Sequence, residues 1–290
     1  MSLTKYHQTI VDYYRDTENA YKDSWDLDNS LAIHYGYWDE KVNSFPQSLV
    51  RMNEIMMEAA AIKPSDKVLD AGCGVGGSSI FLASTLGCHV TGITLSERQV
   101  EQAVAHAKQK GVEKLVDFKV MDYCATDFPD ASFDVLWGCE SICYAEDKHK
   151  FVREAYRLLK PGGRIVIADG FVTVTEYNSR PVIRKWLAGW QVKSLESPSR
   201  FRNLLSLEGF ENVEYRDISK QVTHSSKRLL KYYFLAKLYV WWKTITFSKR
   251  PTAMQRKNII ACWHQYWGLK MQFWQYGLFV CQKPVCASSE

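Results

Sequence analysis

The chain has 290 residues, of which 46% are hydrophobic and 24% charged, proportions typical of a globular protein with a sizeable core. Its 37 basic and 32 acidic residues leave a net charge of +5, which is too small to indicate a nucleic-acid-binding protein. The N-terminus lacks the charged-then-apolar pattern of a signal peptide, and the eight cysteines form no C-x-x-C pair. We therefore expect reduced thiols, no metal site and a cytoplasmic location.

Residues 1–62 are expected to form a helical lid. A helix is predicted over residues 3–23, where five side chains share one face: Tyr6, Ile10, Tyr13, Tyr14 and Tyr21. An apolar-striped helix follows over 47–62. Between the two helices, rings with polar tips crowd around Gly36: His34, Tyr35, Tyr37 and Trp38. Their concentration favours a place over a ligand site, and ordinary core packing is the alternative.

The stretch K-V-L-D-A-G-C-G-V-G-G-S-S at 67–79 predicts a buried strand, a tight turn and a helix start. Glycine suits positions of positive φ, or positions where a ligand touches the main chain. Two ligand-binding patterns fit: the G-x-G-x-x-G of dinucleotide-binding proteins, and D-x-G-x-G-x-G, in which Asp70 supplies an anion for the ammonium group of S-adenosylmethionine (SAM). We expect Asp70, Gly72 and Gly74 to contact the ligand. A turn that binds nothing is the third possibility.

The second strand, C-H-V-T-G-I-T-L-S over 88–96, ends without a carboxylate. This absence counts against NAD, because dinucleotide-binding proteins carry an acid about 20 residues after the glycines for the ribose hydroxyls. Gln99, near the start of a helix predicted over 97–110, offers an amide in place of the acid. We expect Thr94, Leu95 and Gln99 to contact the cofactor.

Three further strands complete the alternation of strands and helices that a parallel doubly wound sheet requires. The third ends at Asp122, which can accept a hydrogen bond from an adenine amine or simply cap a turn; Tyr123 follows it. The fourth, over 132–137, runs into Gly138 and Glu140. A helix is predicted over 147–160, and the last strand has the apolar sequence R-I-V-I-A-D at 164–169, typical of a strand buried between helices.

Together these motifs resemble those of class I SAM-dependent methyltransferases: the D-x-G-x-G-x-G turn, G-I-T-L-S, M-D, F-D-V-L and L-L-K-P-G-G-R-I-V-I. A finer resemblance links the chain to sterol C-methyltransferases, γ-tocopherol methyltransferases and their alkaloid N-methylating relatives. It is carried by I-H-Y-G-Y-W-D at 33–39, G-I-T-L-S-E-R-Q at 92–99 and W-G-C-E-S-I-C-Y-A-E-D-K at 137–148. The chain departs from that group in having Tyr35 and Tyr144 where the group has histidines. Both residues are expected near the acceptor, so the resemblance leaves the identity of the acceptor open.

The resemblance implies a Rossmann-like α/β fold with a seven-stranded, mostly parallel sheet, SAM as cofactor, and a cap over a hydrophobic acceptor. We expect a core over 63–218, which ends with a short helix over 201–209 and a sixth strand over 213–218. A helical cap is expected over 219–275, followed by an antiparallel closing strand and tail over 276–290. Lysines interrupt the apolar run of the cap and exclude a transmembrane span: Lys231, Lys237 and Lys243. A plain helical core and peripheral membrane contact are the alternatives for the cap.

Glu140 is the predicted catalytic carboxylate, with His34 and Tyr144 as neighbours. Tyr14, Tyr35, Tyr123 and Gly138 are added to the expected cofactor contacts. Three aromatic faces are candidates for cation–π stabilisation of positive charge: Tyr35, Trp38 and Trp137. A dipole-stabilised carboxylate at a helix start is the structural alternative for Glu140.

The predicted reaction is C-methylation of an isoprenoid-type acceptor, such as a sterol, terpenoid, prenyl diphosphate or prenylquinol. N-methylation of a small amine or alkaloid is the alternative, and a non-catalytic SAM-binding protein is a remote one. A prenyl diphosphate would need a metal and basic residues, for which three cations after the fifth strand are candidates: Arg180, Arg184 and Lys185.

Overall fold

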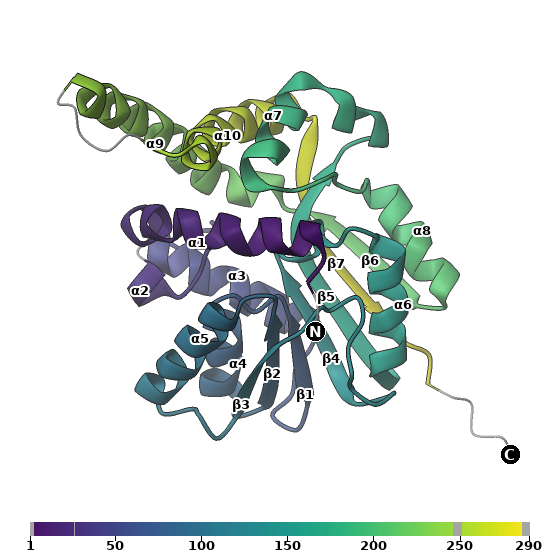
Figure 1. Cartoon of the computed structure of the whole chain (residues 1–290). Helices are drawn as coiled ribbons and strands as arrows, with labels where there is room; N and C mark the ends of the chain where they lie inside the picture. Colours follow the sequence, from purple (N-terminus) through teal and green to yellow (C-terminus); the bar gives the residue numbers. More distant parts are fainter. Residues whose placement is uncertain (1–2, 26, 246–250, 286–290) are drawn as a thin grey trace, which may run out of the picture.

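A computed structural model describes residues 3–25, 27–245 and 251–285. Its centre is a seven-stranded sheet in the order β3-β2-β1-β4-β5-β7-β6 (Figure 1). The strands are β1 Lys67–Ala71, β2 His89–Thr94, β3 Val116–Val120, β4 Phe133–Cys139, β5 Leu159–Val172, β6 Glu211–Asp217 and β7 Trp274–Gln282. The first five strands pair in parallel, whereas β7 lies antiparallel between β5 and β6. The predicted fold class is confirmed.

Helices cover both faces of the sheet: α3 Phe45–Ala59, α4 Gly77–Leu86, α5 Glu97–Lys110, α6 Lys148–Leu158 and α8 Pro198–Glu208. Successive side chains of a strand point to opposite faces, so the sheet divides the core into two clusters. In β1, Val68 belongs to one cluster and Leu69 to the other, and both are fully buried. The central parallel strands are therefore apolar on both faces, whereas β3 at the edge of the sheet exposes Asp117 and Lys119.

The remaining long helices lie over the carboxyl ends of the strands. They are α1 Lys5–Trp25, α7 Pro181–Trp190, α9 Ser219–Ile245 and α10 Ala253–Lys270, with the short α2 Leu27–Ser30 beside α1 (Figure 1). Helix α7 packs closely on α10: a Cβ added to Gly189 would lie 2.5 Å from the Cβ of Ala261. No helix of the described residues is long and apolar enough to cross a membrane.

The boundaries of several elements differ from the predicted ones. The segment K-P-G-G at 160–163 is predicted to break a helix, but the helix ends at Leu158 and the segment continues as strand β5. It does so because it pairs with the chain after β7, where Lys283 donates its backbone N–H to the carbonyl of Gly163 at 2.8 Å. At the edge of the sheet β3 ends at Val120, so that Asp122 lies in the following loop.

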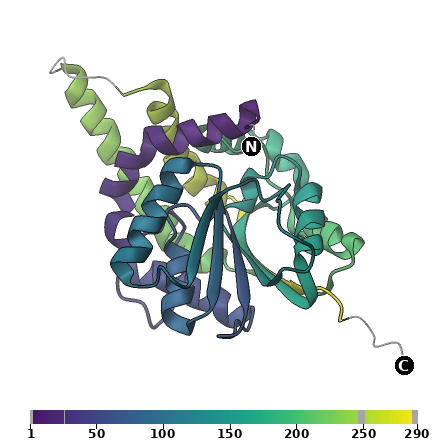
Figure 2. The same ribbon diagram turned by 60° about the horizontal axis from the view of Figure 1, so that its bottom comes forward.

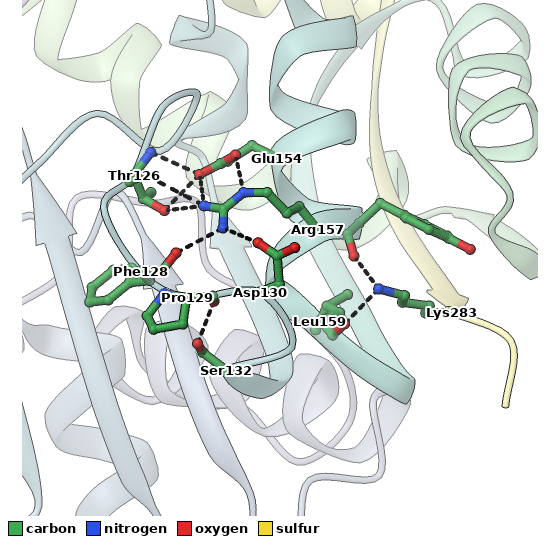
Figure 3. A network of polar contacts seen from close by, with 10 residues as sticks. Thr126, Phe128, Pro129, Asp130, Ser132, Glu154, Arg157, Leu159 and Lys283 are labelled. Atoms are coloured by element: carbon green, nitrogen blue, oxygen red, sulfur yellow. Dashed lines mark hydrogen bonds and ion pairs between the residues drawn. The ribbon is translucent and has the colours of Figure 1, made fainter. Parts of the chain in front are cut away.

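Arg157 fixes the loop between β3 and β4 to helix α6 (Figure 3). Its guanidinium donates to the carboxylates of Glu154 and Asp130 and to the carbonyl of Phe128, at 2.6–3.0 Å. Glu154 in turn accepts the backbone N–H of Thr126 at 2.8 Å. Burial alone would raise the pKa of Glu154, but the hydrogen bonds from Arg157 and Thr126 outweigh it and lower that pKa. The network holds a loop that begins at the candidate site.

Candidate active site

A cavity of about 940 Å³ lies at the carboxyl ends of the central strands, between the sheet and the helices of the lid and cap. This is the edge at which open α/β sheets bind ligands. Its wall includes most of the predicted site residues: Tyr14, His34, Tyr35, Asp70, Gly72, Gly74, Thr94, Leu95, Gln99, Tyr123, Glu140 and Tyr144. The structure thus brings together residues from segments far apart in the chain.

The glycine turn after β1 forms one end of the cavity. Gly72 and Gly74 adopt φ values of +93° and +54°, which glycine tolerates best. A Cβ on Gly72 would lie 2.4 Å from the Cβ of Ser141, so the turn packs closely against the segment that follows β4. A Cβ on Gly74 would meet nothing within 4 Å, which leaves its main chain open to a ligand. The turn fits a nucleotide-like group.

Asp70 closes the same end of the cavity. Its Oδ2 accepts the Ser79 hydroxyl at 2.6 Å. Burial raises the pKa of Asp70 to about 6, against the opposing effect of the hydrogen bonds from Ser79. The carboxylate is therefore mostly ionised at neutral pH, as the binding of an ammonium group requires.

The end of β2 contributes an amide to the cavity. Thr94 donates its hydroxyl to Oε1 of Gln99 at 2.6 Å, and the hydroxyl of Ser96 accepts the backbone N–H of Gln99, which fixes the start of α5. Gln99 thus lies where the acid of a dinucleotide-binding protein is expected, and Leu95 adjoins it on the cavity wall.

Two predicted cofactor contacts lie outside the cavity wall. Asp122 caps its own turn, because its Oδ1 accepts the backbone N–H of Cys124 at 2.8 Å; its Oδ2 lies 3.7 Å from Nε2 of His7. Tyr123, next to it, does line the cavity and donates to the carbonyl of Ser141 at 2.8 Å. Gly138 lies inside β4, where a Cβ would come within 2.8 Å of the side chain of Ile142. Close packing against Ile142 therefore explains why position 138 is a glycine.

Glu140 occupies the centre of the cavity wall. It follows β4 with a φ of +49°, a left-handed conformation that costs a non-glycine residue about 1 kcal/mol or more. The backbone N–H of Glu140 donates to the carbonyl of Ala168 at 2.8 Å, which fixes this turn against β5. Strained backbone of this kind concentrates at functional sites.

The carboxylate of Glu140 accepts two hydrogen bonds at one oxygen, Oε1. The backbone N–H of Tyr35 donates at 2.5 Å and the hydroxyl of Tyr276 at 2.7 Å. Burial, together with repulsion from Asp169, outweighs these bonds and raises the pKa of Glu140 to about 8. A carboxyl group that titrates near neutral pH is suited to proton transfer.

His34 and Tyr144 share the cavity with Glu140 but bond elsewhere. Nδ1 of His34 lies 2.9 Å from the carbonyl of Tyr35, and burial lowers the pKa of the imidazole. Tyr144 donates its hydroxyl to the carbonyl of Trp190 at 3.0 Å, and its ring lies 5.9 Å from that of Tyr14. Both side chains are at the site, but neither hydrogen-bonds to the catalytic candidate.

A methyltransferase-domain family model matches residues 69–167. The curated methyltransferase GfsG of Streptomyces halstedii is 31% identical over 228 residues, which cover 78% of this chain and 81% of that protein. The chain therefore belongs to the class I SAM-dependent methyltransferases. The chloroplastic tocopherol O-methyltransferase of Arabidopsis thaliana is 27% identical over 95% of this chain and 82% of its own length.

The fold of this methyltransferase matches that of solved relatives over its whole length. The geranyl diphosphate C-methyltransferase of Streptomyces coelicolor, solved with Mg²⁺, geranyl diphosphate and S-adenosylhomocysteine, superposes with a TM-score of 0.75 at 20% identity, covering 98% of this chain and 99% of that chain. SAM is the cofactor of this family. The residues at the β1 end fit it, because an ionised carboxylate and an exposed glycine main chain face one cavity.

Sequence reasoning missed two residues of the cavity wall, Tyr276 and Asp169, and one residue that contacts the wall. Tyr276 lies on β7. Gln265 lies on α10 outside the cavity wall, where its Oε1 accepts the hydroxyl of Tyr35 at 2.8 Å. Asp169 lies on β5, lines the cavity and accepts the backbone N–H groups of Cys143 and Gly170 at 2.8 and 2.7 Å. In the sequence R-I-V-I-A-D, Asp169 follows a run of apolar strand residues, as Asp70 does in β1. This shared pattern is the sequence signal that could have identified Asp169.

The aromatic wall of the cavity differs from the predicted one. Of the three rings expected to face positive charge, Tyr35 lines the cavity, but Trp38 stacks on His224 at 4.8 Å and Trp137 is fully buried in β4. The expectation for those two was wrong, because Trp137 is buried inside the sheet and Trp38 packs half-buried against His224, and neither lines the cavity. Other rings complete the wall: Tyr14, Tyr21, Tyr144, Trp186, Trp190, Trp274 and Tyr276.

Proposed function

We propose that this methyltransferase methylates a carbon atom of a small, hydrophobic, isoprenoid-type acceptor. The observation that carries the proposal is the cavity itself, in which the Glu140 carboxylate faces a wall built largely of aromatic and aliphatic side chains. When bound, SAM supplies an electrophilic methyl group on a sulfonium. Apolar pockets with a few placed polar groups are typical of sites for hydrophobic small molecules.

Glu140 is proposed to stabilise the positive charge that develops on the acceptor and to take the proton that leaves the methylated carbon. A positive charge nearby favours the ionised carboxylate and lowers its pKa below about 8. Tyr276 and the backbone N–H of Tyr35 hold Oε1 in place for this step. The neighbouring rings supply faces for cation–π contact with the same charge.

The proposed contacts to SAM lie at the β1 and β2 ends of the cavity. Asp70 is proposed to bind the ammonium group, and the main chain at Gly72 and Gly74 to approach the nucleotide. Gln99 and Thr94 are proposed to meet the ribose hydroxyls, as polar groups at that strand end do in related sheets. Tyr14, Leu95 and Tyr123 would enclose the remainder, leaving Glu140 and Tyr35 toward the acceptor.

The acceptor is proposed to be uncharged at the reacting end. No lysine or arginine occurs among the described residues that line the cavity. Arg180 instead lies over the rings of Tyr177 and Phe273, each 5.4 Å from the guanidinium. Arg184 and Lys185 likewise lie outside the cavity wall. This favours a sterol, terpenoid or prenylquinol over a prenyl diphosphate, and the similarity to a tocopherol methyltransferase agrees with a prenyl-type substrate.

Methylation of an amine is the second candidate. Two carboxylates in one aromatic cavity, Glu140 and Asp169, offer a site for a substrate ammonium group. The apolar wall favours the bulky isoprenoid, because beside SAM a small amine would leave apolar surface of the cavity in contact with water.

The experiment is incubation of the full chain with methyl-labelled SAM and a panel of sterols, prenylquinols, terpenoids and alkaloid amines, read by mass spectrometry. The proposal predicts a labelled product that carries the methyl group on carbon of an isoprenoid. Transfer to amines alone would contradict the proposed acceptor, although the protein would still be a methyltransferase.

A further inference from the structure

The outer end of α9 carries large apolar side chains on the protein surface. Seven of them are more than half exposed: Phe234 at 56%, Leu235 at 61%, Leu238 at 61%, Tyr239 at 53%, Trp241 at 60%, Trp242 at 55% and Ile245 at 54%. Because an α-helix turns about 100° per residue, all of them except Tyr239 fall on one arc of roughly 120°, and these six residues we term the α9 apolar face. A contiguous apolar surface marks an interaction site, unlike apolar residues scattered singly.

The α9 apolar face is placed where a flat surface can reach it. In both views α9 and α10 extend away from the sheet, and the C-terminal part of α9 projects beyond the remainder of the molecule (Figures 1 and 2). The face is therefore not a shallow patch on the body of the protein but the side of a projecting helix.

The chain around this face is basic throughout. Between residues 218 and 270 the sequence has no aspartate or glutamate, whereas it has the following lysines and arginines: Lys220, Lys227, Arg228, Lys231, Lys237, Lys243, Lys249, Arg250, Arg256, Lys257 and Lys270. On α9 itself Lys231 and Lys237 are exposed. Helical geometry places Lys237 roughly 40° from Trp241, at the edge of the arc, and Lys231 roughly 80° from Trp241, within the arc. The partner of this surface is accordingly anionic.

We infer that the α9 apolar face binds the surface of an anionic phospholipid bilayer. Tryptophan, phenylalanine and leucine beside lysines on one helix are the composition of helices that lie in the headgroup region of such membranes. Lysine stems also cover apolar surface while their ammonium groups reach the phosphates. A second copy of the chain fits less well, because it would bring the same excess of basic residues.

The α9 apolar face also reaches the active-site cavity. Leu235 belongs both to the α9 apolar face and to the cavity wall, where its neighbours on α9 are Tyr232 and Ala236. An apolar path thus runs from the helix surface to the cavity, along which a lipid-soluble acceptor enters from the bilayer. This second step rests on the proposed hydrophobic acceptor, whereas membrane binding itself does not.

Vesicle cosedimentation of the full chain tests the binding step. The probes are vesicles of phosphatidylcholine alone and of phosphatidylcholine mixed with phosphatidylglycerol. We expect binding to the mixed vesicles that weakens as salt is added. The double variant Leu238→Ser with Trp241→Ser should lose at least about tenfold in partitioning, since each large apolar side chain gains from burial. The charge variant Lys231→Glu with Lys237→Glu should lose at least about fivefold per lysine.

Matched controls separate the face from a general effect of the substitutions. Leu207→Ser removes a leucine that is 81% exposed on α8, and Lys108→Glu with Lys110→Glu reverses two exposed lysines on α5. Both controls should bind mixed vesicles as the wild type does. The inference is overturned if the wild type binds neither vesicle, if the α9 variants bind normally, or if sedimentation velocity shows a dimer that the Leu238→Ser, Trp241→Ser variant dissociates.

The entry step has its own measurement. With the acceptor dissolved in vesicles the Leu238→Ser, Trp241→Ser variant should methylate slowly, whereas in detergent micelles it should match the wild type. Equal loss in both media would contradict entry from the bilayer. Absence of any isoprenoid methylation would contradict the proposed function and leave the result of the vesicle-binding experiment standing.

Discussion

Glu140 combines three features that rarely coincide at a residue without a chemical role. Its backbone is left-handed, its side chain is half-buried on the cavity wall, and two donors converge on a single oxygen atom of its carboxylate. A carboxylate that only capped a helix start would sit in water and keep a low pKa. The structure therefore favours a chemical role over the helix-capping alternative.

The pH dependence of the reaction follows from the pKa of this group. Below its pKa of about 8 in the free enzyme, Glu140 is protonated and unable to accept a proton. We expect kcat/KM to rise with pH and to level off above about 8, because kcat/KM reports the free enzyme. The measurement is kcat/KM for the methyl acceptor from pH 6 to 10. A profile that is flat or that falls with pH would contradict a base role.

Tyr276 is expected to act through Glu140. Tyr276→Phe removes the hydroxyl that donates to Oε1, so the ionised carboxylate loses a bond and its pKa rises. The rising limb of the kcat/KM profile should move to higher pH by roughly one unit. A hydrogen bond to a charged group is worth about 1.5–3 kcal/mol, and a change of one pKa unit corresponds to about 1.4 kcal/mol.

The control for this variant is Tyr215→Phe, which removes a hydroxyl bonded to Gln275 at 2.8 Å on the neighbouring strand, outside the cavity wall. Its profile should match that of the wild type. A change in kcat/KM without any shift of the profile in Tyr276→Phe would indicate a purely structural tyrosine.

At the scale of elements, the loop between β3 and β4 links stability to cofactor binding. Arg157→Ala removes the cation that binds Glu154 and Asp130, and so loosens the loop that carries Tyr123. We expect a loss of about 1–2 kcal/mol of unfolding free energy and a severalfold weaker affinity for S-adenosylhomocysteine. Chemical denaturation and calorimetry measure the two effects.

Arg153→Ala on the same helix is the matched control, because Arg153 is exposed on the outer face of α6. It should leave both quantities unchanged. Equal losses of unfolding free energy and of S-adenosylhomocysteine affinity in the two variants would show that any such substitution on α6 has this effect. That outcome would contradict a specific role for the loop network.

Sequence reasoning succeeds for elements whose signal is local. The glycine turn, the Asp70 position and Glu140 follow strands that the apolar pattern marks clearly, and the parallel alternation fixes the edge of the sheet at which they meet. It fails where a contact is long-range: Tyr276 lies 136 residues from Glu140, and Gln265 lies 230 residues from Tyr35. The insertion of β7 between β5 and β6, which places Tyr276 opposite Gly170, brings Tyr276 to the cavity, and helix α10 brings Gln265 to Tyr35.

For the whole molecule, buried carboxyl groups tie stability to pH. Burial raises the pKa values of Asp70 and Asp169 to about 6 and that of Glu140 to about 8. These groups ionise in the unfolded chain near pH 4, but in the folded chain only at higher pH. The unfolded state therefore releases its protons first, so stability present at low pH is lost as pH rises through 6 and 8.

Glu140→Gln should remove part of this dependence. Near pH 5 the variant and the wild type should have similar unfolding free energies, because Glu140 is neutral in the fold. At pH 9 the variant should be the more stable by up to a few kcal/mol, since each unit of pKa shift is worth about 1.4 kcal/mol. Denaturant titrations at the two pH values measure the difference, and a constant difference would show that the Glu140 pKa is not raised.

The most direct test of the account is a paired measurement on Glu140→Gln: calorimetric binding of S-adenosylhomocysteine, and single-turnover transfer of labelled methyl to an acceptor that the wild type uses. Glu101→Gln, an exposed residue of α5, is the control. The account predicts cofactor affinity close to that of the wild type and a transfer rate lower by roughly 100-fold or more. Transfer at the wild-type rate with unchanged cofactor affinity would contradict it.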